Sequence, residues 1–175
     1  MAKPTFSKLK LQLKKEAVPV QFGEQTITVK QYLPIKDKLT LIGDVIGYAH
    51  DFNTNYNNPV KTEMLFHLEL IYAYTDLTFT KTQQEEVFKT YDLLKSSGLL
   101  DIILNAIPKD EYDTLYEGLN KTITSIYAYR NSALGILDNI NQAAESSGQG
   151  FQALQDALAN PENFELLTQI LSKLG

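Results

Sequence analysis

The sequence predicts an α+β protein that is mostly α-helical. Residues 1–33 contain short runs in which apolar and polar side chains alternate around a glycine, a pattern typical of β-strands. Residues 34–144 instead repeat their apolar positions every three or four residues, as helices do. Residues 145–150 have the composition of a flexible linker, and residues 151–175 are helical in pattern again. We therefore expect an N-terminal β-hairpin or small three-stranded sheet packed on a bundle of about five helices, with a C-terminal helical tail.

The composition limits the classes of function. A chain of 175 residues can form one domain, or one domain with an appendage, around a sizeable core. Its net charge of −5 and pI near 5.0 argue against a general affinity for nucleic acid or for an anionic membrane. Because the chain has no cysteine, disulfides, thiol nucleophiles and thiolate metal sites are excluded. No apolar run reaches the roughly 18 residues of a membrane span, so we expect a cytosolic setting.

Three strands are predicted at the N-terminus. In residues 5–14, leucines alternate with lysine and glutamine, which predicts a strand with one apolar and one charged face. Residues 18–22 and 26–33 predict two further strands joined by a turn at Gly23, and Pro19 suits an edge strand. The five lysines among the first fifteen residues allow two interpretations. They protect an edge strand from wrong pairing, or they form a basic arm that attracts nucleic acid or an acidic protein patch.

The first two helices are predicted on either side of a polar loop. Ile35–His50 has helical spacing, and its Gly43 and Gly47 either weaken the helix or admit a second helix at close range. Residues 51–58 form a loop by composition. Asn58 and the proline after it predict the cap and first residue of a helix that reaches about Tyr74. That helix is apolar nearly all round, which marks it as the most buried one.

Two further helices are predicted before the longest one. Thr80 and Gln83 match a capping box, and Gly98 stands where a C-terminal cap glycine belongs. Residues 99–107 form a short apolar helix that Pro108 stops. The apolar positions of the helix after Thr80 are Val87, Phe88, Tyr91, Leu93 and Leu94.

Residues 110–144 predict a single long helix with an apolar stripe, which Arg130, the only arginine of the chain, interrupts. In one interpretation, Arg130 and Asn131 are a buried polar site that fixes register or meets a partner's carboxylate. In the other, Arg130 lies at the edge of the stripe and its stem covers apolar surface. Tyr127 lies close enough in sequence to contact Arg130 in either case. The stripe packs within one molecule or pairs two copies, and the pattern leaves both open.

No residue pattern predicts a catalytic, cofactor or metal site. His67 follows Glu63 on one helix face, but the chain has no second such pair, and we expect both His67 and His50 to be structural. The Glu85–Glu86 and Asp110–Glu111 pairs lie at predicted helix starts or on solvated faces, which disfavours a role in acid–base catalysis. The sequence contains no phosphate-binding glycine loop, no nucleophile elbow and no nucleotide fingerprint.

The tail beyond the linker is predicted to bind something. Residues 151–159 and 161–174 form two short amphipathic helices, and such an apolar tail must pack on its own domain or on a partner. The residues that we expect at a partner interface are Tyr127, Arg130, Asn131, Phe164, Leu167, Ile170 and Leu171.

Five phrases spread over most of the chain carry a family resemblance. They are Val29-Lys-Gln-Tyr-Leu-Pro-Ile35, Asn58-Pro-Val-Lys61, the segment from Tyr72-Ala-Tyr-Thr75 to Phe79-Thr80, Tyr129-Arg-Asn-Ser-Ala-Leu-Gly-Ile136, and the close from Asn160-Pro-Glu-Asn to Leu174-Gly175. In these phrases the chain resembles small virion-module proteins of tailed bacteriophages of Gram-positive hosts. Its architecture is similar to that of tail assembly chaperones, which bind the tape-measure protein. The resemblance implies a non-enzymatic protein of the host cytoplasm or the virion, with other phage structural or assembly proteins as partners.

Three hypotheses follow. The first is a phage structural or assembly protein that acts through protein–protein contacts, without a specific nucleic acid, membrane or cofactor, and with homo-oligomerisation left open. The second is an acidic phage effector that binds and inhibits a host protein. The third is an enzyme of unknown type, which a deep pocket holding converging carboxylates or both histidines would support.

Overall fold

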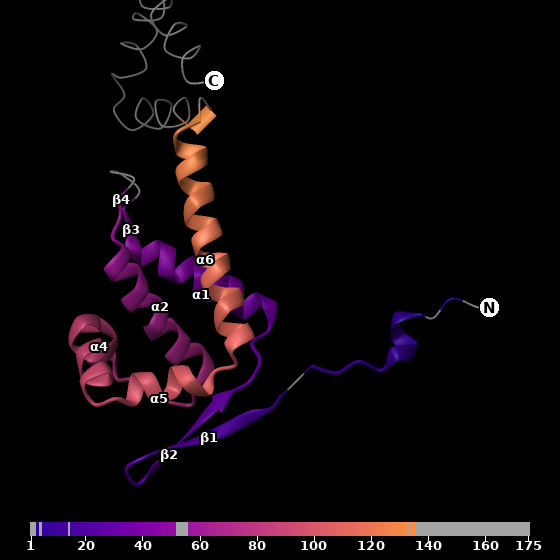
Figure 1. Cartoon of the computed structure of the whole chain (residues 1–175), viewed down its shortest axis with the longest axis vertical. Helices are drawn as coiled ribbons and strands as arrows, with labels where there is room; N and C mark the ends of the chain where they lie inside the picture. The colour runs from indigo at the N-terminus through magenta and orange to yellow at the C-terminus, as the bar shows by residue number, and fades with distance from the viewer. Residues whose placement is uncertain (1–2, 4, 14, 52–55, 133, 136–175) are drawn as a thin grey trace, which may run out of the picture. The chain divides into compact units, whose positions relative to one another are not determined.

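The structure is a computed structural model that describes residues 3, 5–13, 15–51, 56–132 and 134–135. Its helices dominate, and two small antiparallel sheets of two strands each accompany them within these residues (Figure 1). The predicted fold class is confirmed, with an N-terminal hairpin packed on helices. The chain divides into two compact units, residues 1–119 and residues 120–175. We call the first the N-terminal unit.

The hairpin of the N-terminal unit consists of β1 (Ala17–Phe22) and β2 (Gln25–Lys30). Gly23 in the turn has a φ of +60°, a left-handed conformation that glycine adopts without the steric cost of a side chain. Ile27 and Val29 of β2 are buried, as their alternation predicts, while Thr28 between them is exposed. The hairpin thus offers one apolar face to the helices.

Both outer edges of the hairpin are poorly suited to further pairing. The backbone N–H of Thr28 donates to Oδ1 of Asp76 at 2.8 Å, and Val29 forms a bridge with Thr75, so β2 is covered. On β1, the N–H of Gln31 donates to the carbonyl of Glu16 at 2.9 Å. In an antiparallel ladder hydrogen-bonded and non-hydrogen-bonded pairs alternate, so this bond places the backbone nitrogen of Pro19 on the outer side of β1. Proline has no N–H, so this position offers no donor to a further strand.

The prediction of a third strand over residues 5–14 is wrong for the residues that the structure describes. Residues Phe6–Leu9 form a 3₁₀-helix, η1, followed by Lys10 in a left-handed conformation with a φ of +49°. Residues 11–13 have no regular secondary structure and belong to no ladder. Alternation shows that a segment suits a strand, but a strand also needs an edge to pair with. The edge of β1 is impaired by Pro19, and that of β2 is occupied.

The helix α1 (Ile35–Ala49) follows the hairpin and ends at the short strand β3 (His50–Asp51), which pairs with β4 (Tyr56–Asn57). His50 was predicted to be helical and residues 51–58 to be a loop, so both predictions are wrong at the positions of these two short strands. A Cβ added at Gly43 or Gly47 would meet nothing within 4 Å, so none of the described helices approaches closely there. The residues of α1 that are buried are Lys38, Leu41, Val45, Ile46 and Ala49.

The helix α2 (Pro59–Tyr74) is the most buried helix of the described chain, as predicted. Oδ1 of Asn58 accepts hydrogen bonds from the N–H groups of Val60 and Lys61, both at 3.1 Å, which confirms the predicted cap. Phe66, Leu70 and other apolar side chains of this helix are fully buried and supply the centre of the core.

The predicted helix after Thr80 is divided into α3 (Lys81–Glu85) and α4 (Val87–Ser96). The capping box of Thr80 and Gln83 is present. Glu86 breaks the helix with a ψ of 54°, and the hydroxyl of the buried Thr90 donates to the carbonyl of Gln83 at 2.7 Å across the break. Two apolar positions predicted for this helix are not in the core, since Phe88 is 62% and Leu93 is 59% exposed.

The last two described helices are α5 (Leu99–Ala106) and α6 (Lys109–Arg130). Gly98 precedes α5 with a φ of +79°, as expected of a glycine that ends the helix before it. The predicted helix of residues 110–144 is not continuous, because α6 ends at Arg130 and Asn131 and Ser132 are not helical. Residues 134–135 are helical again, and residues 136–144 lie outside the described residues. The N–H of Ser132 bonds to the carbonyl of Tyr129 at 3.0 Å, which is a tighter turn than the α-helix has, and the Ser132 hydroxyl accepts from the N–H of Gly135 at 3.2 Å.

Candidate functional site

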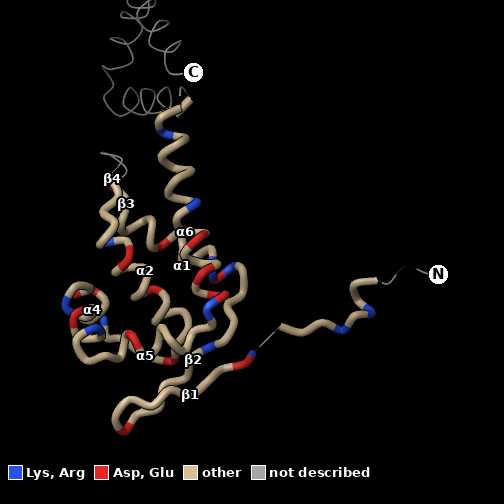
Figure 2. Tube along the Cα trace, in the orientation of Figure 1, with Lys and Arg blue, Asp and Glu red and all other residues tan. Residues whose placement is uncertain are grey.

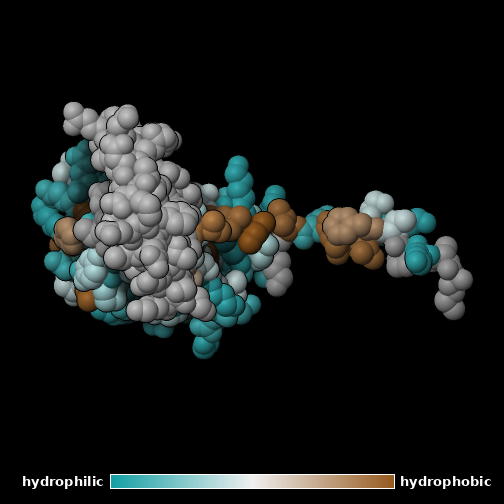
Figure 3. Space-filling model, turned by 90° about the horizontal axis from the view of Figure 1, so that it is seen from above, coloured by the Kyte–Doolittle hydropathy of each residue, from teal (hydrophilic) through white to brown (hydrophobic). Residues whose placement is uncertain are grey.

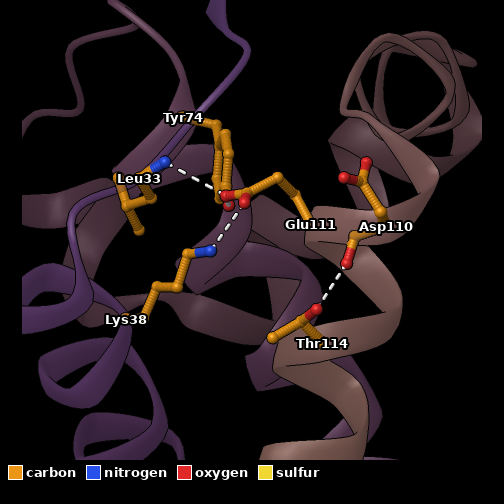
Figure 4. A network of polar contacts seen from close by, with 6 residues as sticks. All are labelled: Leu33, Lys38, Tyr74, Asp110, Glu111 and Thr114. Carbon is orange, nitrogen blue, oxygen red and sulfur yellow. Dashed lines mark hydrogen bonds and ion pairs between the residues drawn. The ribbon is translucent and has the colours of Figure 1, made fainter. Parts of the chain in front are cut away.

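A buried carboxylate, Glu111, lies at the junction of the hairpin, α1, α2 and α6 (Figure 4). Its Oε1 accepts from Nζ of Lys38 at 2.6 Å, and its Oε2 accepts from the Tyr74 hydroxyl at 2.8 Å and the Leu33 N–H at 3.1 Å. The Lys38 ammonium also lies 5.1 Å from the centre of the Tyr32 ring. We call this group the Glu111 network.

The electrostatics of the Glu111 network keep the carboxylate ionised. Burial alone raises the pKa of Glu111, but the hydrogen bonds from Lys38, Tyr74 and Leu33 and the charge of Lys38 outweigh it, and the net shift is downward. Burial and the hydrogen bond to Glu111 raise the pKa of Tyr74, so its hydroxyl stays protonated and donates. With both oxygens of Glu111 engaged by donors of its own chain, the arrangement is suited to joining elements and leaves little capacity for a ligand.

Both acidic residues, Asp110 and Glu111, were expected at a helix start or on a solvated face. Glu111 does lie in the first turn of α6, but it is buried and not solvated. Its neighbour Asp110 fits that expectation: Asp110 is exposed and its side chain points away from the network (Figure 4). Nothing in the local sequence distinguishes these two acidic residues at the start of α6. The helical phase gives the only signal, since Glu111 is four residues before the buried Leu115 and Asp110 is not.

His67 of α2 lies in a second polar cluster among aromatic rings. Its Nε2 is 3.2 Å from the Tyr112 hydroxyl, and its ring stacks on Tyr91 with centroids 6.5 Å apart and planes 9° apart. Burial lowers the pKa of His67, and the charge of Lys95 lowers it further, against opposing contributions from Glu63 and Asp101. Its Nδ1 has no hydrogen-bond partner within the described residues. The neutral ring is thus favoured, as expected of a structural histidine.

Glu69 of α2 carries an unusual charge environment. Burial, with a smaller contribution from Asp44 of α1, raises the pKa of Glu69 from 4.5 to about 7. A lone pair of carboxylates does not form a metal centre. Within the residues that the structure describes, no group of three or more histidine or acidic side chains is placed to hold a metal ion.

A surface groove lies where α5 meets α6. It has a volume of about 770 Å³, and its wall is formed by residues of α5 from Asp101 onward, by Ile107 and Pro108, and by the start of α6 as far as Asp113. Leu104, Ile107 and Tyr112 contribute apolar surface, and Asp101 and Asp113 contribute carboxylates. We call it the α5–α6 groove. At its rim Gln31 donates from Nε2 to the carbonyl of Ala106 at 3.0 Å.

The described N-terminal segment, residues 5–13, exposes an unusual amount of apolar surface. We call it the N-terminal arm. The exposed fraction is 79% for Phe6, 54% for Leu9, 66% for Leu11 and 65% for Leu13. Figure 3 shows these side chains as brown atoms along the arm at the right of that view, and Figure 2 shows only blue basic positions among its charged residues. The combination of exposed leucines and lysines is typical of a segment that binds an acidic partner surface.

The residues predicted for a partner interface are only partly described. Tyr127 and Arg130 are half-buried on the last turn of α6, and Asn131 is exposed directly after it. Arg130 is the last residue of the helix, where its positive charge interacts favourably with the helix dipole. Phe164, Leu167, Ile170 and Leu171, like the linker and tail as a whole, lie outside the described residues. Alternation predicts a strand over residues 5–14, so the leucines of the N-terminal arm are not among the predicted interface residues.

Comparison with protein-family models, with curated proteins and with solved structures found no match to this chain. Among the described helices, none combines the length and the apolar character needed to cross a bilayer.

Proposed function

We propose that this protein is a non-enzymatic assembly factor or structural component of a tailed bacteriophage, acting through contacts with other phage proteins. The observation that carries the proposal is the N-terminal arm, in which four large apolar side chains are each more than half exposed within nine residues. Surface of this kind is costly to leave in water and is typical of binding segments. The phage assignment itself depends on the sequence resemblance, and a tail assembly chaperone is the specific role that it favours.

The polar clusters of the N-terminal unit are consistent with binding better than with catalysis. The Glu111 network directs its donors and acceptors at one another, and the His67 ring is enclosed by Tyr91 and Tyr112. General acid–base catalysis needs a titrating group within reach of a substrate. The α5–α6 groove is open, but its Asp101 and Asp113 are already ion-paired with Lys95 and Lys109, respectively.

Co-expression with the tape-measure protein encoded in the same genome tests the specific role. We expect the two proteins to copurify, and we expect deletion of residues 151–175 to abolish the interaction. Copurification that survives the deletion would contradict the predicted role of the tail. Partner capture from infected cells tests the class, because a host protein recovered as the main partner would favour the effector hypothesis instead.

A further inference from the structure

Charge is distributed very unevenly between the start of the chain and the remainder. The first fifteen residues contain five lysines and no acidic residue. The other 160 residues contain eleven basic and 21 acidic residues, a net charge of −10. The first fifteen residues therefore carry a charge of +5, of which Lys8 and Lys10 lie in the N-terminal arm, and they are joined to a body of opposite charge. The arm is electrostatically complementary to that body, and so to the body of a second copy.

Like charge disfavours arm-to-arm pairing, and the hairpin disfavours strand addition. Two paired arms would bring their lysines together on one face, which is destabilising. The outer edge of β1 lacks a donor at Pro19, and the outer edge of β2 is occupied by Thr75 and Asp76. A surface that accepts the side chains of the arm is therefore a better site than a strand edge.

The α5–α6 groove has the chemistry that the arm requires. Its apolar wall, which includes Leu104, Ile107 and Tyr112, suits the leucines, and the carboxylates of Asp101 and Asp113 suit the lysines. Both carboxylates are about half exposed and paired with exposed lysines. Such surface ion pairs contribute little free energy, so exchange of their lysines for those of the arm costs little.

The C-terminal end of the arm is attached next to the groove, but the arm does not fill the groove. Glu16, just after the arm, is bonded through its carbonyl to Gln31, and Gln31 lines the groove. Yet Phe6, Leu9, Leu11 and Leu13 all remain more than half exposed, so they are not seated in the groove of their own molecule. An element attached beside its complementary site, but not in it, is suited to exchange between two copies.

We propose that the N-terminal arm of one molecule binds the α5–α6 groove of a second copy, and that the exchange is reciprocal in a symmetric dimer. Its leucines pack on the apolar wall, and its lysines approach Asp101 and Asp113. This inference does not depend on the phage assignment, because both partners are copies of this chain.

Sedimentation of the full-length protein over a range of concentrations tests the association. We expect a monomer–dimer equilibrium that weakens with added salt. Replacing three leucines (Leu9→Ser, Leu11→Ser and Leu13→Ser) should raise the dissociation constant by at least about a hundredfold, because each leucine that loses burial costs about tenfold or more. A monomer at every concentration would overturn the proposal.

A matched pair of charge variants separates specific contact from net charge. Lys8→Glu with Lys10→Glu should weaken the dimer, whereas Lys81→Glu with Lys89→Glu should leave it unchanged. Both double variants have the same net charge, and Lys81 and Lys89 lie on exposed surface outside the groove. Equal weakening by both pairs would show that only overall charge matters, which would overturn the proposed contact.

Cysteine cross-linking identifies the groove and the partner, since the natural chain has no cysteine. Leu11→Cys in one tagged copy and Asn105→Cys in another should form a disulfide between the two copies. Leu11→Cys with Lys81→Cys, which lies outside the groove, should not. If one chain that carries both Leu11→Cys and Asn105→Cys forms the disulfide only within itself, the exchange between copies is overturned. Binding of a monomeric wild type to anionic vesicles or nucleic acid through the arm would also overturn it.

Discussion

At the scale of single residues, Glu111 has the largest structural role that can be assigned in the N-terminal unit. One carboxylate accepts bonds from α1, from the end of α2 and from the backbone after the hairpin. Removing one partner of a buried ion pair leaves the other charge uncompensated, which costs more than the pair contributes. The network therefore specifies how these elements meet, even where its net free energy is small.

We expect Glu111→Gln to destabilise the protein by about 3 kcal/mol, because Lys38 then keeps a buried charge without its counterion. Chemical denaturation at one fixed protein concentration measures this change. Asp110→Asn is the matched control, one residue away and exposed, and should cost less than about 1 kcal/mol. Equal losses in the two variants would contradict the role assigned to Glu111.

The pH dependence of stability should change in the same variant. Because the pKa of Glu111 is lower in the folded state than its ordinary value of 4.5, its ionised form stabilises the fold above about pH 4.5. That contribution is lost as the pH falls through the folded pKa. The wild type should therefore approach the stability of Glu111→Gln under acid conditions, and a difference that stays constant down to pH 2 would contradict this assignment.

At the scale of elements, two glycines of opposite conformation allow a matched test. Gly98 has a φ of +79°, whereas Gly43 lies on α1 with open space around it. We expect Gly98→Ala to destabilise by about 1–2 kcal/mol and Gly43→Ala to stabilise by up to about 1 kcal/mol. Thermal unfolding measures both changes. A stabilised Gly98→Ala variant would contradict the left-handed cap.

The packing of α1 on α2 includes an unfavourable charge at Glu69. Since its pKa is about 7 in the fold and 4.5 ordinarily, the folded state binds this proton more tightly than the unfolded chain does. Ionisation therefore destabilises the fold progressively between about pH 4.5 and 7. We expect Glu69→Gln to be more stable than the wild type by about 1–2 kcal/mol at pH 8, after allowance for partial exposure, and equal to it at pH 4.

Denaturation at the two pH values measures this effect. Glu24→Gln, in the exposed hairpin turn, should show no comparable gain at either pH. Asp44→Asn should produce part of the gain at pH 8, because Asp44 contributes to the raised pKa of Glu69. No gain in the Glu69 variant would show that its carboxylate is solvated.

The elements that local sequence could predict are those that local chemistry determines. The cap at Asn58, the capping box at Thr80 and the glycine at position 98 each act within a few residues of themselves. Two predictions failed for other reasons. The strand expected over residues 5–14 needed a distant strand edge to pair with. The helix expected to continue through Arg130 competed with hydrogen bonds of the Ser132 side chain. Alternation cannot reveal that the neighbouring strand edge is blocked by Pro19.

At the scale of the whole molecule, charge and apolar surface are distributed unequally. The N-terminal arm is basic and exposes its leucines, while the helices of the N-terminal unit enclose a core that is centred on α2. Burial of the Glu111 and His67 clusters leaves the arm and the α5–α6 groove as the described surfaces best equipped for recognition. The proposed function and the proposed dimer both use these two surfaces, so the oligomeric state bears directly on how much of them is available to other partners.

Hydrogen exchange followed by mass spectrometry should report this distribution in one experiment. Amides of α2 should exchange slowest, because opening them requires unfolding of the core. The Leu33 amide lies outside regular secondary structure, yet it should be protected through its bond to Glu111 and should lose protection in Glu111→Gln. Amides of the arm should exchange quickly in dilute protein and more slowly as concentration rises, since seating in a second copy shields them. In the triple leucine variant the arm should exchange quickly at every concentration, and concentration-independent exchange in the wild type would contradict arm exchange.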